Sequence, residues 1–133
     1  MQVRKRNGKI VEYDGKKIIA AIKKAFKAAE VEDCHNIAFN IAFVVTVILE
    51  NRGTDEPVTI DEIQNLVEYK LAESCEKYGI PMYKVAKKYI LYRDRRDKDR
   101  ESINKLSKIF SEIINISDND TKKSNANIDG NTP

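Results

Sequence analysis

Tryptophan, histidine and cysteine are scarce in this chain of 133 residues, which has no tryptophan, one histidine and two cysteines. Cys34 and Cys75 stand far apart, and neither belongs to a CxxC pair. A disulfide framework needs several paired cysteines, and a structural zinc site needs four clustered sulfur or nitrogen ligands. The sequence argues against both kinds of site, and we expect two reduced thiols in a cytoplasmic protein.

Long apolar segments are also lacking. The strongest one, Ile37–Leu49, has only thirteen residues, whereas a helix needs about 20 to cross a bilayer. No apolar h-region follows the N-terminus, so we expect neither a signal peptide nor a membrane span. The formal net charge of +3 is too mild to indicate a nucleic-acid coat protein.

Positive charge is concentrated at the N-terminus. Nine lysines and arginines lie within the first 27 residues, where Glu12 and Asp14 are the only acids. Asn7-Gly8 lies between the extended segments Gln2–Arg6 and Lys9–Tyr13, and this pair predicts a β-hairpin with a type I′ turn and positive φ at both residues. A basic hairpin followed by a lysine-rich helix suits a polyphosphate ligand.

Four helices are predicted after the hairpin. Asp14 caps the first, and its apolar face carries Ile18, Ile22, Ala25, Phe26 and Ala29.

The second helix is expected from about Asp33 to Asn51. Its β-branched residues favour a strand, but its length favours a helix. Its own apolar residues occupy nearly all sides of the helix. Such a helix either lies centrally in a bundle or has its outer face against a partner. A homo-oligomer through Ile37–Leu49 is one such arrangement.

Local signals also place the remaining elements. Pro57-Val58 is a possible third strand, and Thr59 with Glu62 forms a capping box for a third helix that ends at Gly79. Pro81 can open a fourth helix. We expect one domain over residues 1–96, a helical extension or linker over 97–116, and a disordered tail over 117–133.

Several motifs then become recognisable. They are Val3-Arg-Lys-Arg-Asn-Gly8, Tyr13-Asp14 with Lys17-Ile18, Val58-Thr-Ile-Asp-Glu-Ile-Gln64 and Val85-Ala-Lys-Lys-Tyr-Ile-Leu-Tyr-Arg93. In this order they resemble the ATP-cone, a regulatory nucleotide-binding domain at the N-terminus of many ribonucleotide reductases. Ser124–Pro133 is similar to the segment that opens the catalytic part of anaerobic, class III ribonucleoside-triphosphate reductases. This similarity favours the anaerobic enzyme over the other ribonucleotide reductases.

This resemblance implies an α+β, mostly helical fold: a four-helix bundle capped by a small three-stranded β-sheet, with ATP or dATP between cap and bundle. It implies that ATP activates and dATP inhibits the reductase. Mg²⁺ would accompany the triphosphate, held by phosphate oxygens and waters rather than by protein ligands. The chain has no P-loop, radical cysteine pair or glycyl-radical segment, so catalysis would belong to a catalytic domain of the same polypeptide.

The resemblance also carries over candidate contact residues. They are Val3, Lys5, Arg6, Val11, Asp14, Lys17, Ile18, Ile60, Gln64, Lys87 and Lys88. The basic residues would bind the phosphates, with Lys87 and Lys88 as second choices. The aliphatic residues would enclose the adenine, and Gln64 would form a hydrogen bond with the edge of the adenine ring. Asp14 either caps its helix or accepts a hydrogen bond from the ribose or the adenine amine. Solvated lysines and an ordinary aliphatic core are the alternatives.

Two other functions stay open at this point. A nucleic-acid-binding module would use the basic hairpin and the segment Lys84–Arg96, whose interleaved tyrosines could stack on bases. ATP-cones also occur in a repressor of reductase genes behind a zinc ribbon, but here the hairpin begins at residue 2 without a four-cysteine cluster. A helical interaction domain without a ligand is the third possibility.

Overall fold

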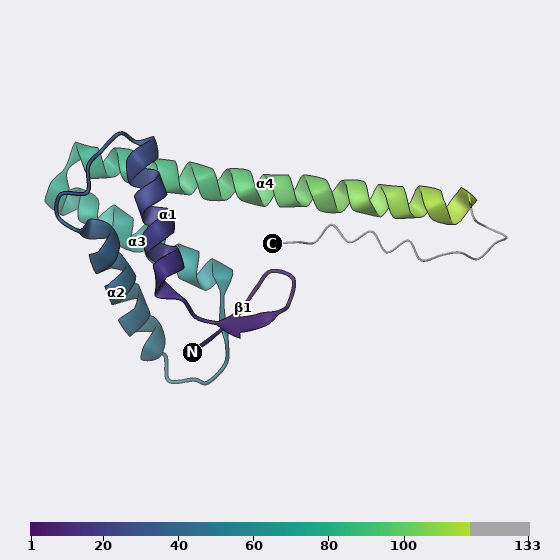
Figure 1. Ribbon diagram of the computed structural model, residues 1–133, viewed down its shortest axis with the longest axis horizontal. Coiled ribbons are helices and arrows are strands. Elements are labelled where there is room, and N and C mark those ends of the chain that lie inside the picture. The colour runs from purple at the N-terminus through teal and green to yellow at the C-terminus, as the bar shows by residue number, and fades with distance from the viewer. Residues whose placement is uncertain (118–133) are drawn as a thin grey trace. The chain divides into compact units, whose positions relative to one another are not determined.

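The computed structural model describes residues 1–117. Of the tail predicted over residues 117–133, Ser117 is the last residue of α4, and residues 118–133, with the Ser124–Pro133 motif, lie outside the described residues. Two compact units divide the chain, Met1–Arg93 and a second that begins at Asp94. The elements are β1 (Gln2–Arg4), β2 (Ile10–Glu12), α1 (Gly15–Ala28), α2 (Ile37–Glu50), β3 (Val58–Thr59), α3 (Ile60–Tyr78) and α4 (Ile80–Ser117) (Figure 1). The expected fold class, α+β and mostly helical, is confirmed.

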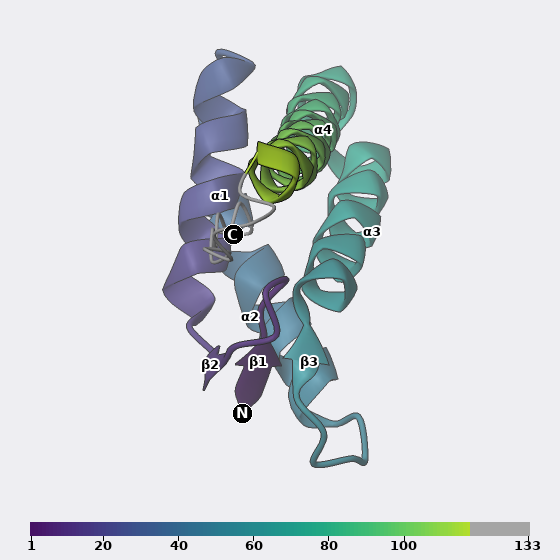
Figure 2. The same cartoon turned by 90° about the vertical axis from the view of Figure 1, so that its right-hand side faces the viewer.

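The small sheet is organised around β1, its central strand. The strand order is β2-β1-β3, and β1 runs antiparallel to β2 and parallel to β3. Val3 lies opposite Val11 on one side and Val58 on the other. The sheet lies at the end of the first unit where α1 and α3 begin (Figure 2). The expected strand at Pro57-Val58 is therefore present as β3.

The turn between β1 and β2 differs from the predicted type I′ turn. Gly8 has a φ of 87°, but Asn7 is not among the residues with positive φ. The Lys5 amide donates to the Lys9 carbonyl at 2.8 Å, and the Gly8 amide donates to the Lys5 carbonyl at 2.9 Å. This pattern is a three-residue loop in which glycine alone needs positive φ. Asn7 instead accepts a hydrogen bond from the Lys9 amide at 3.0 Å.

Caps define where α1 and α2 begin. Asp14 accepts from the Lys16 amide at 3.0 Å, which confirms its predicted capping role. The predicted start of α2 near Asp33 was four residues too early. The Asp33 carboxylate accepts from the amides of Ile37 at 2.6 Å and Ala38 at 3.0 Å. It therefore satisfies first-turn amides from outside the helix, and α2 begins at Ile37.

The two faces of α2 have different surroundings. Its inner face packs against the rest of the first unit and is buried at Ile37, Ala38, Ile41, Ala42, Val45 and Leu49. Its outer face exposes five large apolar side chains, Phe39, Phe43, Val44, Val47 and Ile48. Phe43 is 62% exposed. Thus α2 is not central in a bundle within residues 1–117. The other predicted arrangement, in which the outer face lies against a partner, stays a prediction.

The predicted capping box at the start of α3 is confirmed. The Glu62 amide donates to the Thr59 hydroxyl at 3.1 Å, and the Thr59 amide donates to the Glu62 carboxylate at 3.3 Å. At its other end α3 stops at Tyr78, and Gly79, with a φ of 79°, is the single residue between α3 and α4. The expected glycine stop is therefore also present.

One apolar core joins the sheet and the four helices of the first unit. Val3 and Val58 enter it from the sheet, and Ile22, Leu71 and Val85 are among its fully buried side chains. Ile22 comes from the apolar face that helical spacing predicted for the first helix. Within residues 1–117, no helix has the length and apolar character that a bilayer crossing requires.

The second unit contains the rest of α4 from Asp94. Ion pairs join Asp94 to Lys98 at 3.0 Å and Asp97 to Arg100 at 2.6 Å along the helix surface. The segment Ile103–Ile114, within the extension or linker expected over residues 97–116, is helical. Its large apolar side chains are exposed, and these are Ile103, Leu106, Ile109, Phe110 and Ile113.

Asp61 joins the hairpin and α4 to the start of α3. Its carboxylate accepts from Arg6 at 2.9 Å and from Arg93 at 3.3 Å. Arg93 also donates to Glu68 and, at 2.8 Å, to Asn65. Burial alone would raise the pKa of Asp61, but the hydrogen bonds and charges of Arg6 and Arg93 outweigh it and lower that pKa.

The capping box predicts the effect of a single substitution. Thr59→Ala removes the acceptor for the Glu62 amide, so the free energy of unfolding should fall by about 1 kcal/mol. Thr59→Ser keeps the hydroxyl and should recover most of that loss. Urea denaturation followed by circular dichroism measures both variants, and equal loss in both would show that the cap contributes little.

The lowered pKa of Asp61 predicts a pH dependence. A carboxyl whose pKa is lower in the folded state stabilises the fold above its unfolded pKa, about 3.9, and this contribution disappears as pH falls through the folded pKa. Asp61→Asn should therefore reduce stability at pH 7 and match the parent below that window. Since Asp61 is largely exposed, the loss should stay under about 1 kcal/mol.

The control for this measurement is Glu73→Gln, which removes an exposed ion pair with Lys70 in the middle of α3. Urea midpoints at pH 7 and pH 3 compare the three proteins. A difference between Asp61→Asn and the parent that is the same at both pH values would contradict the ion-pair explanation.

Candidate functional site

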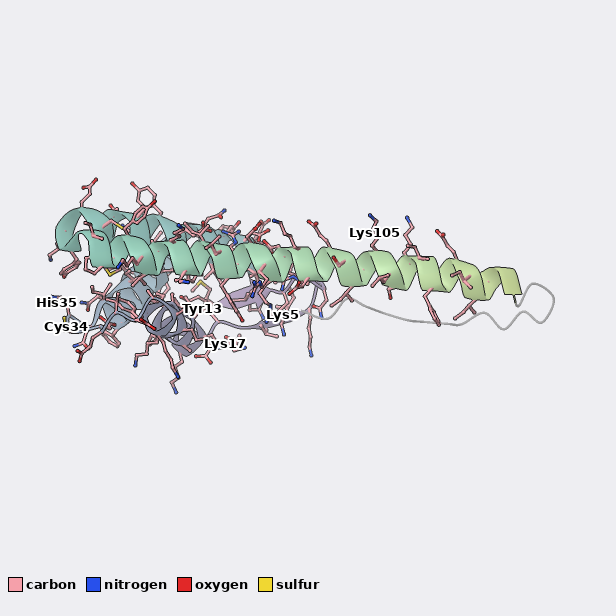
Figure 3. All side chains as sticks on the ribbon, turned by 90° about the horizontal axis from the view of Figure 1, so that it is seen from above. Lys5, Tyr13, Lys17, Cys34, His35 and Lys105 are labelled. Atoms are coloured by element: carbon pink, nitrogen blue, oxygen red, sulfur yellow. The ribbon has the colours of Figure 1, made fainter. Side chains whose placement is uncertain are left out.

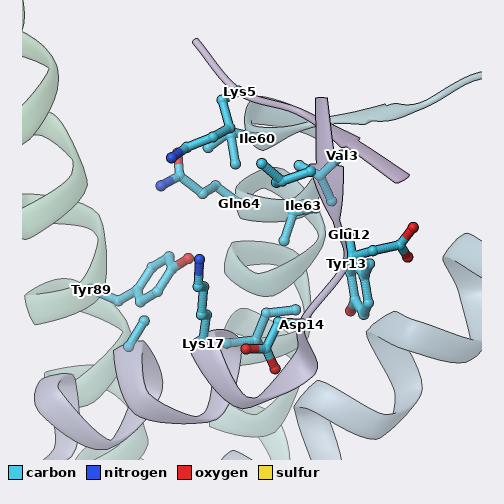
Figure 4. A pocket seen from close by; sticks show the side chains of 13 residues that line it. Val3, Lys5, Glu12, Tyr13, Asp14, Lys17, Ile60, Ile63, Gln64 and Tyr89 are labelled. Atoms are coloured by element: carbon cyan, nitrogen blue, oxygen red, sulfur yellow. The ribbon is translucent and has the colours of Figure 1, made fainter. Parts of the chain in front are cut away.

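A cavity lies between the hairpin and the helices of the first unit. Its volume is about 160 Å³, more than ten times the ~10–15 Å³ that one water needs. Strands β1 and β2 and helices α1, α3 and α4 all contribute to its wall (Figure 4). The lining residues are Val3, Lys5, Val11, Glu12, Tyr13, Asp14, Lys17, Ile18, Ala21, Ile60, Ile63, Gln64 and Tyr89.

The apolar part of the wall comes from paired and periodic positions. Val3 and Val11 face each other across β1 and β2. Ile18 stands in the first turn of α1, while Ile60 and Ile63 are one turn apart at the start of α3. Because the sheet packs on the ends of both helices, these aliphatic side chains enclose a space suited to a flat apolar group.

Two ammonium groups enter the same cavity. Lys5 extends from the end of β1, and Lys17 extends from the first turn of α1 (Figure 4). Within residues 1–117, neither lysine has an ion-pair partner. Two like charges directed into one partly apolar space repel each other, and a polyanion bound there would be attracted by both.

Acidic groups lie on the other side of the cavity. Figure 4 places the carboxylates of Glu12 and Asp14 away from the ammonium groups of Lys5 and Lys17. Asp14 holds the start of α1 through the Lys16 amide. The cavity therefore offers hydrogen-bond acceptors at one side, cations at the other, and aliphatic groups between them.

Arg6 does not line this cavity. Its guanidinium donates to Asp61 at 2.9 Å and to the side-chain oxygen of Gln64 at 2.8 Å. Because the Gln64 oxygen accepts from Arg6, the amide nitrogen of Gln64 is the group left to donate toward a ligand. Arg6 therefore positions Gln64, a role that sequence reasoning did not assign.

The structure brings together eight of the eleven candidate residues and leaves three outside. The eight are Val3, Lys5, Val11, Asp14, Lys17, Ile18, Ile60 and Gln64. Arg6 is outside for the reason just given. Lys87 and Lys88 are exposed on α4, on the opposite side from the buried Ala86 and Tyr89 that face the rest of the unit.

Five lining residues were missed, but the sequence held a signal for four of them. Ala21 lies one turn after Lys17 and Ile18, and Ile63 lies one turn after Ile60, so helical spacing from the known candidates reaches both. Tyr89 belongs to the motif Val85–Arg93, which was quoted for its resemblance to the ATP-cone. Tyr13 belonged to the motif Tyr13-Asp14 but was not chosen as a contact residue, and no sequence pattern selected Glu12.

Tyr13 connects the cavity to α2. Its hydroxyl lies 2.8 Å from the Thr46 hydroxyl, which in turn donates to the Ala42 carbonyl at 2.8 Å. Since the single proton of Thr46 is used in that bond, Tyr13 is the donor between the two hydroxyls. Burial raises the pKa of Tyr13, the Thr46 contact lowers it, and the charge of Glu50 raises it.

The cysteines and the histidine lie elsewhere. Cys34 is exposed and Cys75 half-buried, and both are free thiols. His35 stacks on Tyr78 with ring centroids 4.9 Å apart, and it lies at the far end of the first unit from Lys5 (Figure 3). In the described part of the chain, no group of three or more histidine, cysteine, aspartate or glutamate side chains could hold a metal ion.

Comparison with known proteins agrees with this geometry. The family model described as the ATP cone domain matches residues 1–98. The anaerobic ribonucleoside-triphosphate reductase of Haemophilus influenzae is 35% identical over 94% of this chain and 16% of its own length. That of Escherichia coli is 34% identical over 96% of this chain and 16% of its own length. The ribonucleoside-diphosphate reductase subunit alpha of Chlamydia muridarum is 32% identical over 73% of this chain and 10% of its own length.

This chain thus spans about one sixth of the length of the anaerobic reductases that it matches. The family match covers well over half of the chain and includes every residue that lines the cavity. The chain therefore belongs to the ATP cone family of nucleotide-binding regulatory domains.

Proposed function

We propose that this domain binds ATP and dATP as allosteric effectors of an anaerobic ribonucleoside-triphosphate reductase, with ATP activating and dATP inhibiting it. The catalytic domain would belong to the same polypeptide, as the length of the similar reductases suggests. The observation that carries the proposal is the cavity itself, where Lys5 and Lys17, which have no ion-pair partner within residues 1–117, enter beside aliphatic side chains.

The two sides of the cavity suggest how an adenine nucleotide lies in it. The triphosphate carries about four negative charges, so it faces Lys5 and Lys17 and accepts charge-assisted hydrogen bonds. The adenine ring lies among the aliphatic residues, with the Gln64 amide at its edge. Asp14 accepts from the adenine amine or a ribose hydroxyl with a carboxylate oxygen that its helix cap leaves free. Lys87 and Lys88 stay second choices, because both are exposed outside the cavity.

Mg²⁺ accompanies the triphosphate in this proposal. A small divalent cation keeps several waters and is satisfied by phosphate oxygens. It would lower the charge that the two lysines must balance, and it needs no ligand from the protein.

The response to the two effectors depends on one ribose hydroxyl. Such a group contributes about 1–2 kcal/mol when it is hydrogen-bonded, which lies within the usual allosteric coupling of about 1–3 kcal/mol. An element with two arrangements must convert this difference into a change of activity. We place that element at the apolar outer face of α2 and at Ile103–Ile114, where contacts with a second copy would depend on the nucleotide.

Isothermal titration calorimetry on the 133-residue chain tests nucleotide binding. ATP and dATP should both bind with micromolar affinity. Lys17→Gln should weaken ATP binding by about tenfold or more, because it removes a charge-assisted hydrogen bond to phosphate. Lys16→Gln is the matched control, since Lys16 is the exposed neighbour that does not line the cavity.

The absence of heat with either nucleotide, on a folded sample, would contradict this function. Salt-sensitive binding of DNA without any nucleotide preference would instead support the nucleic-acid-binding alternative.

Sedimentation velocity tests the proposed switch. The chain with ATP and the chain with dATP should differ in mass or shape, because the outer face of α2 is covered in only one state. Phe43→Ser should remove the difference. Tyr69→Ser is the control, because Tyr69 on α3 is equally exposed, at 62%. Identical sedimentation of the parent chain with both nucleotides would contradict this mechanism.

A further inference from the structure

Tyr89 presents an unpartnered polar group to the cavity. Its side chain belongs to the core and is only 8% exposed. Its hydroxyl points into the cavity (Figure 4). Within residues 1–117, no hydrogen bond joins this hydroxyl to another protein group. It is not among the buried polar atoms that lack a partner, so it is accessible from the cavity and available to a ligand there.

The protonation state of this hydroxyl allows it to donate a hydrogen bond. Burial raises the pKa of Tyr89 to about 12, with Arg93 lowering it and Glu68 raising it further. The phenol is therefore protonated at neutral pH and has one proton to donate. Only a small part of the ring is accessible, which leaves too little surface for stacking on a base and makes the hydroxyl the group that a ligand can reach.

The position of the hydroxyl indicates which part of a ligand it meets. Figure 4 shows it on the same side of the cavity as the ammonium groups of Lys5 and Lys17, away from the carboxylates of Glu12 and Asp14. Both ammonium groups are hydrogen-bond donors, and the Tyr89 hydroxyl can donate as well. A neutral donor beside two cations complements an anionic oxygen better than it complements an amine.

We propose that Tyr89 binds phosphate, its hydroxyl donating a hydrogen bond to a phosphate oxygen of the bound nucleotide. This assignment rests on the nucleotide function proposed above and extends it. Lys5 directly follows β1 and Lys17 belongs to α1, so Tyr89 adds α4 to the elements that hold the phosphates. The occupancy of the cavity is thereby coupled directly to the helix that leads out of the domain.

Tyr89→Phe tests this contact, because it removes the hydroxyl and keeps the ring. Since the hydroxyl has no protein partner, the melting temperature without nucleotide should not fall. Affinity for ATP, measured by calorimetry, should weaken about tenfold, the usual effect of losing a hydrogen bond to a charged group. Affinity for adenosine, measured by NMR titration into the millimolar range, should not change.

The matched control is Tyr83→Phe, which removes the hydroxyl of a 63% exposed tyrosine on the same helix. It should leave both affinities and the melting temperature unchanged. If the parent chain binds ATP and Tyr89→Phe binds it equally well, the assignment of Tyr89 is overturned while the nucleotide function stands. If the parent chain does not bind ATP, the nucleotide function itself fails.

Two further outcomes would also overturn the assignment. Equal weakening of ATP and adenosine binding would place the hydroxyl on the base or the sugar. A lower melting temperature of Tyr89→Phe without nucleotide would show that the hydroxyl has a structural partner in the protein.

Discussion

The cavity depends on the pairing of one three-residue strand along both of its edges. Strand β1 bonds to β2, which leads into α1, and to β3, which leads into α3. An isolated hairpin of this length would not persist in water. It is held because Val3 is buried on the helical core and because Arg6 reaches Asp61 and Gln64 on α3. Without that pairing, Lys5, which follows β1, would not face Lys17 of α1.

The basic residues near the hairpin fall into two groups with different surroundings. Arg6 and Arg93 share the Asp61 carboxylate, so their charges serve the attachment of the hairpin and α4 to α3. Lys5 and Lys17 have no such partner in the described part of the chain. An arginine can hold two acceptors at once with its planar fork, whereas a lysine is a mobile point charge suited to a ligand that comes and goes. The basic N-terminus thus combines a structural task and a binding task.

Local signals in the sequence predicted much of this fold. The caps at Asp14 and at Thr59 with Glu62, and the stop at Gly79, depend on neighbours a few residues away, and each is found where it was expected. The start of α2 was missed because Asp33 caps it across an intervening loop.

Contacts between distant parts of the chain were harder to predict. Arg6 matched a family position for phosphate, but its partners Asp61 and Gln64 come more than fifty residues later. Tyr89 was visible as part of the Val85–Arg93 motif. That its hydroxyl reaches an opening between other elements depends on how α4 packs, which periodicity does not show.

The junction at Gly79 fixes the relation between two walls of the cavity. Its torsions, φ 79° and ψ −152°, belong to a region that essentially only glycine occupies, although an added Cβ would meet no atom within 4 Å. The restriction is therefore one of backbone geometry and not of space. Inserting one residue into the first turns of α4, ahead of Tyr89, would turn the residues beyond it by about 100° about the helix axis. Tyr89 would then leave the cavity, so its spacing from Gly79 matters to the site as much as the tyrosine itself.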